Sequence, residues 1–245
     1  MNIEVDTHTH TVLSGHAHST LLENAAAAAK NGLKGFVMTD HGPKLPGSCP
    51  EFNLGTYPFL PSHIEGVRVY AGVESNLIDF EGSIDVREKY LKLTDFVIAG
   101  LHEVVMKPGT KAQNTETVMS AFLNPYVDII AHPDNAAYEL DYEAVVKEAA
   151  KHDRLLEVNN HSFSYRKGGK ANAAIYLPLC KKHGVRVAVS SDAHFAPKIG
   201  SHAIALGIIE EHAFPHELIV NLTMQRFEEY LCERRKRTGA ESKKL

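Results

Sequence analysis

Histidines crowd the start of the chain. His8, His10, His16 and His18 stand beside Asp6 in "VDTHTHTVLSGHAHST". In an extended strand, residues two apart project from the same side, so His8 and His10 should point in one direction. Neutral imidazole nitrogens together with carboxylates make a good site for zinc or a similar divalent ion. A polar surface loop is the alternative interpretation of one such pair, so the rest of the chain must decide.

Further candidate ligands follow short apolar segments along the chain. The candidate metal ligands are His8, His10, His16, His41, Glu74, His102, His132, Asp192 and His194. Each stands near the expected carboxyl end of a strand, and in a parallel barrel those ends meet at one rim, where such folds build active sites. The set exceeds the roughly four ligands of one catalytic zinc, so it favours about two or three ions. We expect the Glu74 carboxylate to bridge two of them.

Two aspartates precede candidate ligands. Asp6 lies in "DTH" and Asp40 in "TDH". One interpretation is that they orient the ligands from outside the metal site, and the other is that they help to end a strand.

The elements that must position these residues alternate along the chain. Apolar runs predict strands at "NIEVD", "GFVMTD", "VRVYAGVES", "DFVIAGLH", "VDIIAHP", "LLEVNNHS" and "VRVAVSSDAH". Thr20 and Glu23 form a capping-box pattern before the helical segment "LLENAAAAAKNG", and Asp141 can cap "YEAVVKEAAKHD". Near-continuous apolar strands separated by helices indicate a parallel sheet that is buried on both faces. "ELIVNLT" is a candidate for an eighth strand.

The length of the chain suits one large α/β domain. A barrel of roughly 250 residues is common, and residues 1–245 show neither a linker nor a second hydrophobic core, so we expect a distorted barrel of seven or eight strands. The final predicted helix is "MQRFEEYLCERRKR". We expect the basic residues from about 234 to 245 to form a solvated helix terminus and a frayed tail.

Composition argues against several classes of protein. A net charge of -4 and a pI near 6.4 give no overall positive field for nucleic acid or an anionic membrane. Cys49, Cys180 and Cys232 are too few and too widely spaced for a disulfide framework or a zinc ribbon. The first residues run directly into a strand pattern, and no apolar stretch is long enough to span a bilayer. We therefore expect a cytoplasmic protein.

The ordered strings "DTHTH", "TDHG", "GLHEVV", "AHPDN" and "SSDAH" resemble the PHP (polymerase and histidinol phosphatase) superfamily, in particular its YcdX-type stand-alone phosphatases. The resemblance covers essentially the whole chain, and the motifs are specific as an ordered set. It implies a distorted TIM-like (β/α)7 barrel with a trinuclear site, usually of zinc and sometimes of manganese or iron. Its ligand groups would be His8, His10, Glu74 and Asp192 for one ion; Glu74, His102 and His132 for a second; and His16, His41 and His194 for a third.

Two residues near these motifs stand apart from the ligand groups. We expect His18 to line the entrance or to cap the following turn. Asp134 in "HPDN" stands where relatives often carry small residues, so it affects the shape of the substrate side.

Closely spaced cations can deprotonate a bridging water near neutral pH and clamp the oxygens of an in-line displacement at phosphorus. The site therefore favours phosphomonoester hydrolysis by a metal-bridging hydroxide, with no serine or cysteine nucleophile. The segment "SFSYRKGGKAN" supplies Arg166, Lys167 and Lys170. We expect Arg166 or Lys167 to bind the phosphate, and a solvated loop is the alternative. His161 either acts on the leaving group or hydrogen-bonds within this loop.

Two other functions compete with a phosphatase. An amidohydrolase-type C–N hydrolase also places His-x-His after the first strand of a barrel, but His16, His41 and the late Asp-x-His pattern fit that class poorly. A PHP-type nuclease or polymerase-associated module would need a broad basic surface that the sequence does not indicate. We expect a small phosphorylated substrate and no stable nucleic-acid or membrane partner. The residues leave open a homo-oligomer, the native metal, the general acid and the choice among histidinol phosphate, sugar phosphates and nucleotides.

Overall fold

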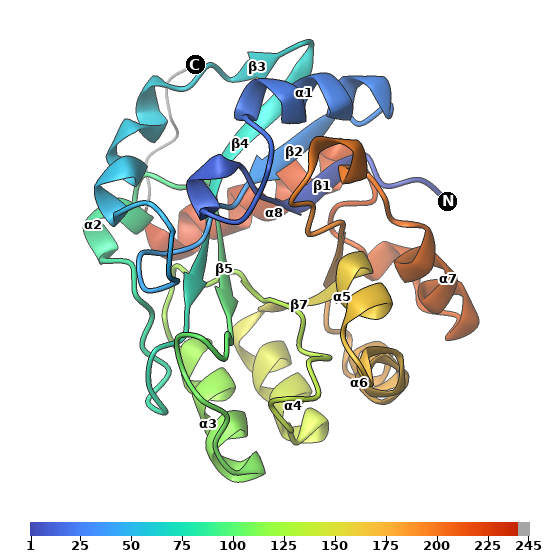
Figure 1. Ribbon diagram of the computed structural model, residues 1–245. Coiled ribbons are helices and arrows are strands. Elements are labelled where there is room, and N and C mark those ends of the chain that lie inside the picture. The colour runs from blue at the N-terminus through green and yellow to red at the C-terminus, as the bar shows by residue number, and fades with distance from the viewer. Residues whose placement is uncertain (240–245) are drawn as a thin grey trace.

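The computed structural model describes residues 1–239. Seven parallel strands, which neighbour one another in chain order, form a nearly closed barrel with helices around its outside (Figure 1). They are β1 (Val5–Thr9), β2 (Gly35–Met38), β4 (Val67–Asn76), β5 (Phe96–Gly100), β6 (Ile129–Ile130), β7 (Leu155–Asn159) and β8 (Val187–Ser190). The short β3 (His63–Ile64) pairs antiparallel with the start of β4. The arrangement confirms the predicted TIM-like (β/α)7 barrel in a single domain.

Helices connect the strands and cover the barrel. They are α1 (Leu21–Lys30), α2 (Glu88–Leu91), α3 (Lys111–Ala121), α4 (Tyr142–His152), α5 (Asn160–Tyr165), α6 (Gly169–His183), α7 (Ala203–Glu211) and α8 (Met224–Thr238). The predicted capping box is present at α1, where the Thr20 hydroxyl accepts from the Glu23 N–H and the Glu23 carboxylate accepts from the Thr20 N–H. Asp141 caps α4. None of the helices within residues 1–239 combines the length and the apolar character that crossing a membrane requires.

Helix α8 covers the amino-terminal end of the barrel, and it runs behind the strands in Figure 1. The apolar cluster there consists of Val5, Val37, Tyr70, Phe96, Ile98, Ile129, Ala131, Leu155, Ala188, Val220, Phe227, Tyr230 and Leu231. Because this end is filled by side chains, the open end of the barrel is the carboxyl-terminal rim.

The contact between β1 and β8 closes the barrel and is irregular. One isolated bridge joins Thr9, at the end of β1, to Ala193, which lies three residues beyond β8. Lower down, the side-chain amide of Asn221 donates to the carbonyls of Val5 (2.7 Å) and Val189 (2.6 Å), and its oxygen accepts from the Val189 N–H (3.0 Å). The backbone of this segment makes only scattered hydrogen bonds, such as that from the Val220 N–H to the Val187 carbonyl (3.0 Å), so the expectation of an eighth strand at "ELIVNLT" is wrong. That segment forms a short 3-10 helix, His216–Leu218, and a single bridge from Ile219.

The end of α8 also differs from the expected solvated tail. The helix continues to Thr238, and Arg234 is fully buried with its Nε 2.7 Å from Asp128 Oδ2. The buried carboxylate needs a cationic partner, and the basic run supplies it. Residues 240–245, the remainder of the expected tail, lie outside the described residues.

Candidate metal centre

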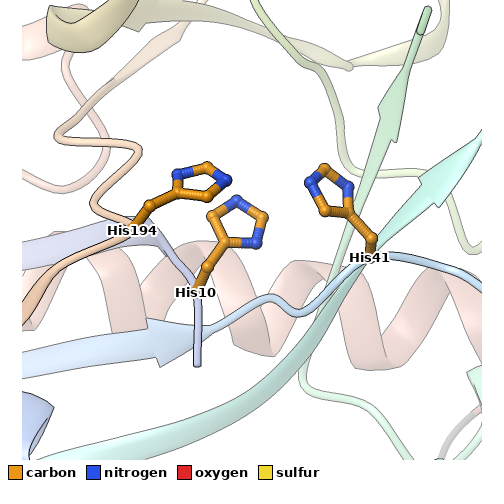
Figure 2. A group of neighbouring side chains, drawn as sticks. All are labelled: His10, His41 and His194. Carbon is orange, nitrogen blue, oxygen red and sulfur yellow. The ribbon is translucent and has the colours of Figure 1, made fainter. Parts of the chain in front are cut away.

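The nine predicted ligands all lie at the carboxyl-terminal rim. His8 and Glu74 belong to β1 and β4, and the others directly follow a strand or the 3-10 helix Val12–Ser14. Figure 2 shows the rings of His10, His41 and His194 gathered from three separate segments of the chain. Donor atoms of three triplets lie within 4.8 Å of one another: His10, His41 and His194; His8, His10 and Glu74; His41, Glu74 and His102.

Glu74 stands between two groups of histidines. Its Oε2 lies 2.8 to 3.5 Å from ring nitrogens of His8, His10 and His41. Its Oε1 lies 3.1 Å from Nε2 of His132 and 3.2 Å from Nε2 of His102. The two oxygens of one carboxylate are thus divided between separate groups of donors, as a bridging role requires.

Two ligand candidates have unusual backbone conformations. Asp192 has φ 52° and His132 has φ 30°, in the left-handed region. Such conformations cost about 1–3 kcal/mol and persist where the surroundings hold them. Asp192 is held on both sides, because its Oδ1 lies 3.3 Å from His10 Nε2 and its Oδ2 accepts from the Asn159 amide at 3.1 Å. The strain therefore coincides with residues that face the site.

Five of the histidines have an acceptor beside Nδ1. The acceptors are Glu157 Oε1 for His8 (2.6 Å), Ser14 Oγ for His10 (3.0 Å), the Ser14 carbonyl for His16 (3.0 Å), Asn76 Oδ1 for His102 (2.8 Å) and the Asp192 carbonyl for His194 (3.1 Å). The Ser14 hydroxyl donates to Asp40 at 2.6 Å and is thus an acceptor for His10. We assign the Nδ1–H tautomer to all five, which directs the Nε2 lone pairs into the site.

The Nε2 lone pairs of neighbouring rings lie close enough together to require a cation between them. Nε2 of His8 lies 3.0 Å from Nε2 of His10, and Nε2 of His194 lies 2.9 Å from Nε2 of His16. Two lone pairs at such distances repel unless a proton or a metal ion lies with them. Glu74 Oε2 and His41 Nδ1 lie 2.8 Å apart, yet neither atom makes a hydrogen bond of good geometry within residues 1–239. A donor set of imidazoles and carboxylates suits zinc, manganese or iron, so the residues fit divalent metals.

The pKa shifts favour ligand-competent forms. Burial lowers the pKa of His132 and of His194 to about 4. For Glu74, burial acts to raise the pKa, but the neighbouring His41, His8 and His102 outweigh it and hold that pKa well below its usual range. Glu74 is therefore ionised and the two histidines are neutral near pH 7, which are the forms that bind metals. His8 is the exception: burial acts to lower its pKa, but Glu157, Asp192 and Glu74 hold it well above its usual value. A metal ion that binds His8 would therefore displace a proton.

Glu157 is a site residue that the sequence analysis missed. Its carboxylate accepts from His8 Nδ1, from the His132 backbone N–H (2.5 Å) and from the Ser190 hydroxyl (2.5 Å). It therefore orients one candidate ligand and fixes the backbone of another. The signal was available in "LLEVN", because an acidic residue in the middle of a buried apolar strand needs partners.

The two predicted outer aspartates act at different places. Asp40 accepts from Thr11 and from the Ser14 hydroxyl, so it reaches His10 through Ser14. Asp6 makes no contact with His8. It accepts from the N–H groups of Ser191 (3.0 Å) and Gly200 (2.9 Å), and thus holds the segment that carries Asp192.

A cavity of about 840 Å³, here called the rim cavity, opens over the histidines. Arg166 lines it, with a buried Nη1 that has no hydrogen-bond partner and lies 4.0 Å from Asp192 Oδ2. Lys167 and Lys170 are exposed and do not line the cavity, whereas His18 and His161 do. The structure thus separates two adjacent basic residues that the sequence treated alike.

Asp134 lies behind this surface and does not line the cavity. It is buried and accepts from the Ser162 hydroxyl. Burial raises its pKa to about 6. Its effect on the cavity therefore passes through α5, which carries Ser162.

Several known proteins resemble this chain over most of its length. Residues 6–168 match the PHP domain family. A protein of Caldicellulosiruptor saccharolyticus named "Probable phosphatase" is 47% identical over 94% of this chain and 97% of its own length. One of Acetivibrio thermocellus with the same name is 41% identical over 97% and 98%.

A solved structure shares the fold at low sequence identity. It is histidinol phosphate phosphatase from Lactococcus lactis, complexed with zinc, L-histidinol and phosphate. The match has a TM-score of 0.59 at 15% identity and covers 88% of this chain and 95% of that one. From the matched residues and the near-full-length relatives, we conclude that this chain belongs to the PHP domain family.

Proposed function

We propose that the protein is a metal-dependent phosphomonoesterase whose rim holds up to three divalent ions. The observation that carries the proposal is the division of the two Glu74 oxygens between separate histidine groups. The relatives named as probable phosphatases, which align over nearly the whole chain, support hydrolysis of a phosphoester.

We take the ligand groups from the family resemblance, and the contacts at the rim support them in part, since His41 also lies beside Glu74. They would be His8, His10, Glu74 and Asp192; Glu74, His102 and His132; and His16, His41 and His194. Zinc is our first choice, because the site is rich in imidazole and the fold neighbour from Lactococcus lactis binds zinc. Manganese and iron are the alternatives. When bound, such ions lower the pKa of water and neutralise charge on phosphate oxygens.

The protein's own residues orient and bind the substrate. Glu157 and Ser14 accept from Nδ1 of His8 and His10, so that Nε2 of each ring faces the site. Arg166 binds a non-bridging phosphate oxygen, because its guanidinium lines the cavity and its buried Nη1 has no hydrogen-bond partner within residues 1–239. None of the described residues that line the cavity is serine or cysteine, so in this proposal water attacks phosphorus directly.

A metal-resolved activity screen tests the proposal. Purified protein is stripped with a chelator, reloaded separately with zinc or manganese, and analysed for bound metal. Each form is assayed on a phosphomonoester, a phosphodiester and an amide. We expect about two or three ions per chain and hydrolysis of the monoester, lost on stripping and recovered on reloading. Preferred cleavage of the diester would favour a nuclease, and cleavage of the amide alone would favour a C–N hydrolase.

A further inference from the structure

Exposed apolar side chains gather around the rim cavity. Val104 is 66% exposed, Tyr165 is 80% exposed and Phe195 is 52% exposed, and all three line it. Leu45, Pro46 and Leu101 add further apolar surface. Apolar surface that remains exposed beside polar groups is typical of a binding site, because a ligand can remove it from water.

These side chains come from opposite sides of the opening. Phe195 follows β8 and Val104 follows β5, and the strand order places those two strands across the barrel from each other. Tyr165 ends α5, which follows β7. A group that extends away from the metal ligands therefore passes between apolar walls.

A row of rings leads from the opening to the metal ligands. The ring centroid of Tyr165 lies 5.5 Å from that of His161, and the His161 centroid lies 6.2 Å from that of His194. Flat surfaces of this kind suit a planar ring, which gains from edge-to-face or offset contacts beyond simple burial.

The charges of the cavity limit what else a substrate can carry. Among the described residues, Arg166 is the one lysine or arginine that lines the cavity, and the proposed function already assigns it to the phosphate. Glu103 also lines the cavity and is exposed. A second phosphate on the leaving group would therefore find a carboxylate and no free arginine or lysine.

We propose that the preferred substrate is the monoester of a single phosphate with an uncharged alcohol that carries an aromatic ring. Phe195, Tyr165 and Val104 contact the ring and determine the specificity. The inference rests on the proposed function, because that function places the phosphate at the metal ligands and Arg166.

Matched substrates measure the preference for a ring. 2-Phenylethyl phosphate and ethyl phosphate both release a primary alcohol, so they differ mainly in the ring. With metal-loaded protein we expect kcat/KM to be about tenfold higher for the phenylethyl ester, mainly through a lower KM. Ethylene glycol bisphosphate, which carries a second phosphate, should be a poorer substrate than ethyl phosphate.

Single substitutions identify which residues produce the preference for the substrate with a ring. Phe195→Ala and Tyr165→Ala should each lower the ratio of the two kcat/KM values by about threefold or more. Tyr165 is distant in sequence from the candidate ligands, so its variant covers the case in which Phe195→Ala disturbs the neighbouring His194. Phe52→Ala is the control, because Phe52 is 75% exposed and does not line the cavity. It should leave the ratio unchanged.

Binding separates this inference from the proposed function. 2-Phenylethylphosphonate and ethylphosphonate are not hydrolysed as esters, and calorimetry on metal-loaded protein compares their affinities. Tighter binding of the phenylethyl compound, weakened in Tyr165→Ala, would support the ring site even if no ester were cleaved. Equal affinities together with equal kcat/KM values would overturn it, while hydrolysis of both esters would leave the phosphatase proposal standing.

Discussion

The two ends of the barrel bury charged side chains in different ways. At the amino-terminal end, Asp128 has partners for both oxygens. Its Oδ2 accepts from Arg234 Nε (2.7 Å) and from the Val97 N–H (2.8 Å), and its Oδ1 accepts from the Tyr230 hydroxyl (3.1 Å) and from Arg237. The chain itself neutralises and solvates this carboxylate.

At the rim, Glu74 and His41 are also buried and Arg166 is partly exposed, and the hydrogen-bond partners of all three are incomplete. Within residues 1–239, Glu74 Oε2, His41 Nδ1 and Arg166 Nη1 make no hydrogen bond, although Oε2 lies 2.8 Å from that Nδ1. Buried polar groups are normally paired. Among the nine buried side-chain atoms within residues 1–239 that lack a partner, four belong to His41, Glu74, His132 and Arg166 at the rim. A cluster of this kind indicates a missing ligand. Asp128, whose two oxygens both have hydrogen-bond partners, therefore supports the fold. The neighbouring groups at the rim that lack hydrogen-bond partners mark a binding site.

Glu74→Gln should have the largest effect on the rim. The substitution preserves shape but removes the charge that both histidine groups share, so we expect loss of bound metal and a fall in kcat/KM of about 100-fold or more. The folded state should persist, since neutralising one acid among many imidazoles leaves the core untouched. Metal analysis, phosphatase kinetics and circular dichroism measure the three quantities.

His18→Ala is the matched control for Glu74→Gln. His18 lines the same cavity but belongs to none of the three donor triplets. The His18→Ala variant should therefore keep its bound metal. If His18→Ala emptied the site while Glu74→Gln stayed fully loaded, the proposed ligand groups would be wrong.

Asp128→Asn should affect the opposite end of the barrel and leave the rim intact. Removing one partner of a buried ion pair strands the other charge, and we expect the free energy of unfolding to fall by about 3–5 kcal/mol. Denaturant titration measures this loss, and metal content per folded chain should match that of the native sequence. Loss of metal in the folded variant would contradict the separation of the two ends.

The barrel and the metal ligands could be predicted from sequence because their signals are local. Each strand is a short apolar run, and ligands such as His41 and His102 directly follow one. Parallel strands then bring these ends together without further information. The residues around Glu74 could therefore be listed before any contact was known.

Contacts between distant segments could not be predicted in this way. Glu157 meets His8 across 149 positions, and Arg234 meets Asp128 across 106. Such pairs form only when the barrel closes, so no spacing in the sequence reports them. The expected strand at residues 217–223 failed for a related reason, since scattered backbone hydrogen bonds and the Asn221 side chain hold this segment beside β1 and β8 without a regular strand ladder.

Replacing Arg166 tests whether its guanidinium, which lacks a full set of hydrogen-bond partners, binds the substrate phosphate. Arg166→Ala should keep its metal and lower kcat/KM for a phosphomonoester by about tenfold, equivalent to about 1.5 kcal/mol. We choose the lower end of the range for a charge-assisted hydrogen bond because the side chain is 23% exposed and water can replace part of the contact. Arg166→Lys should restore only part of the loss, because an ammonium keeps the charge but lacks the planar pair of donors.

His41→Ala, measured alongside, should instead lose metal, and Lys167→Ala should behave as the native protein does because Lys167 is exposed outside the cavity. Native kinetics in fully loaded Arg166→Ala would show that the unpaired guanidinium does not bind the phosphate, and the segment "SYRKGG" would then be an ordinary solvated loop beside the metal centre.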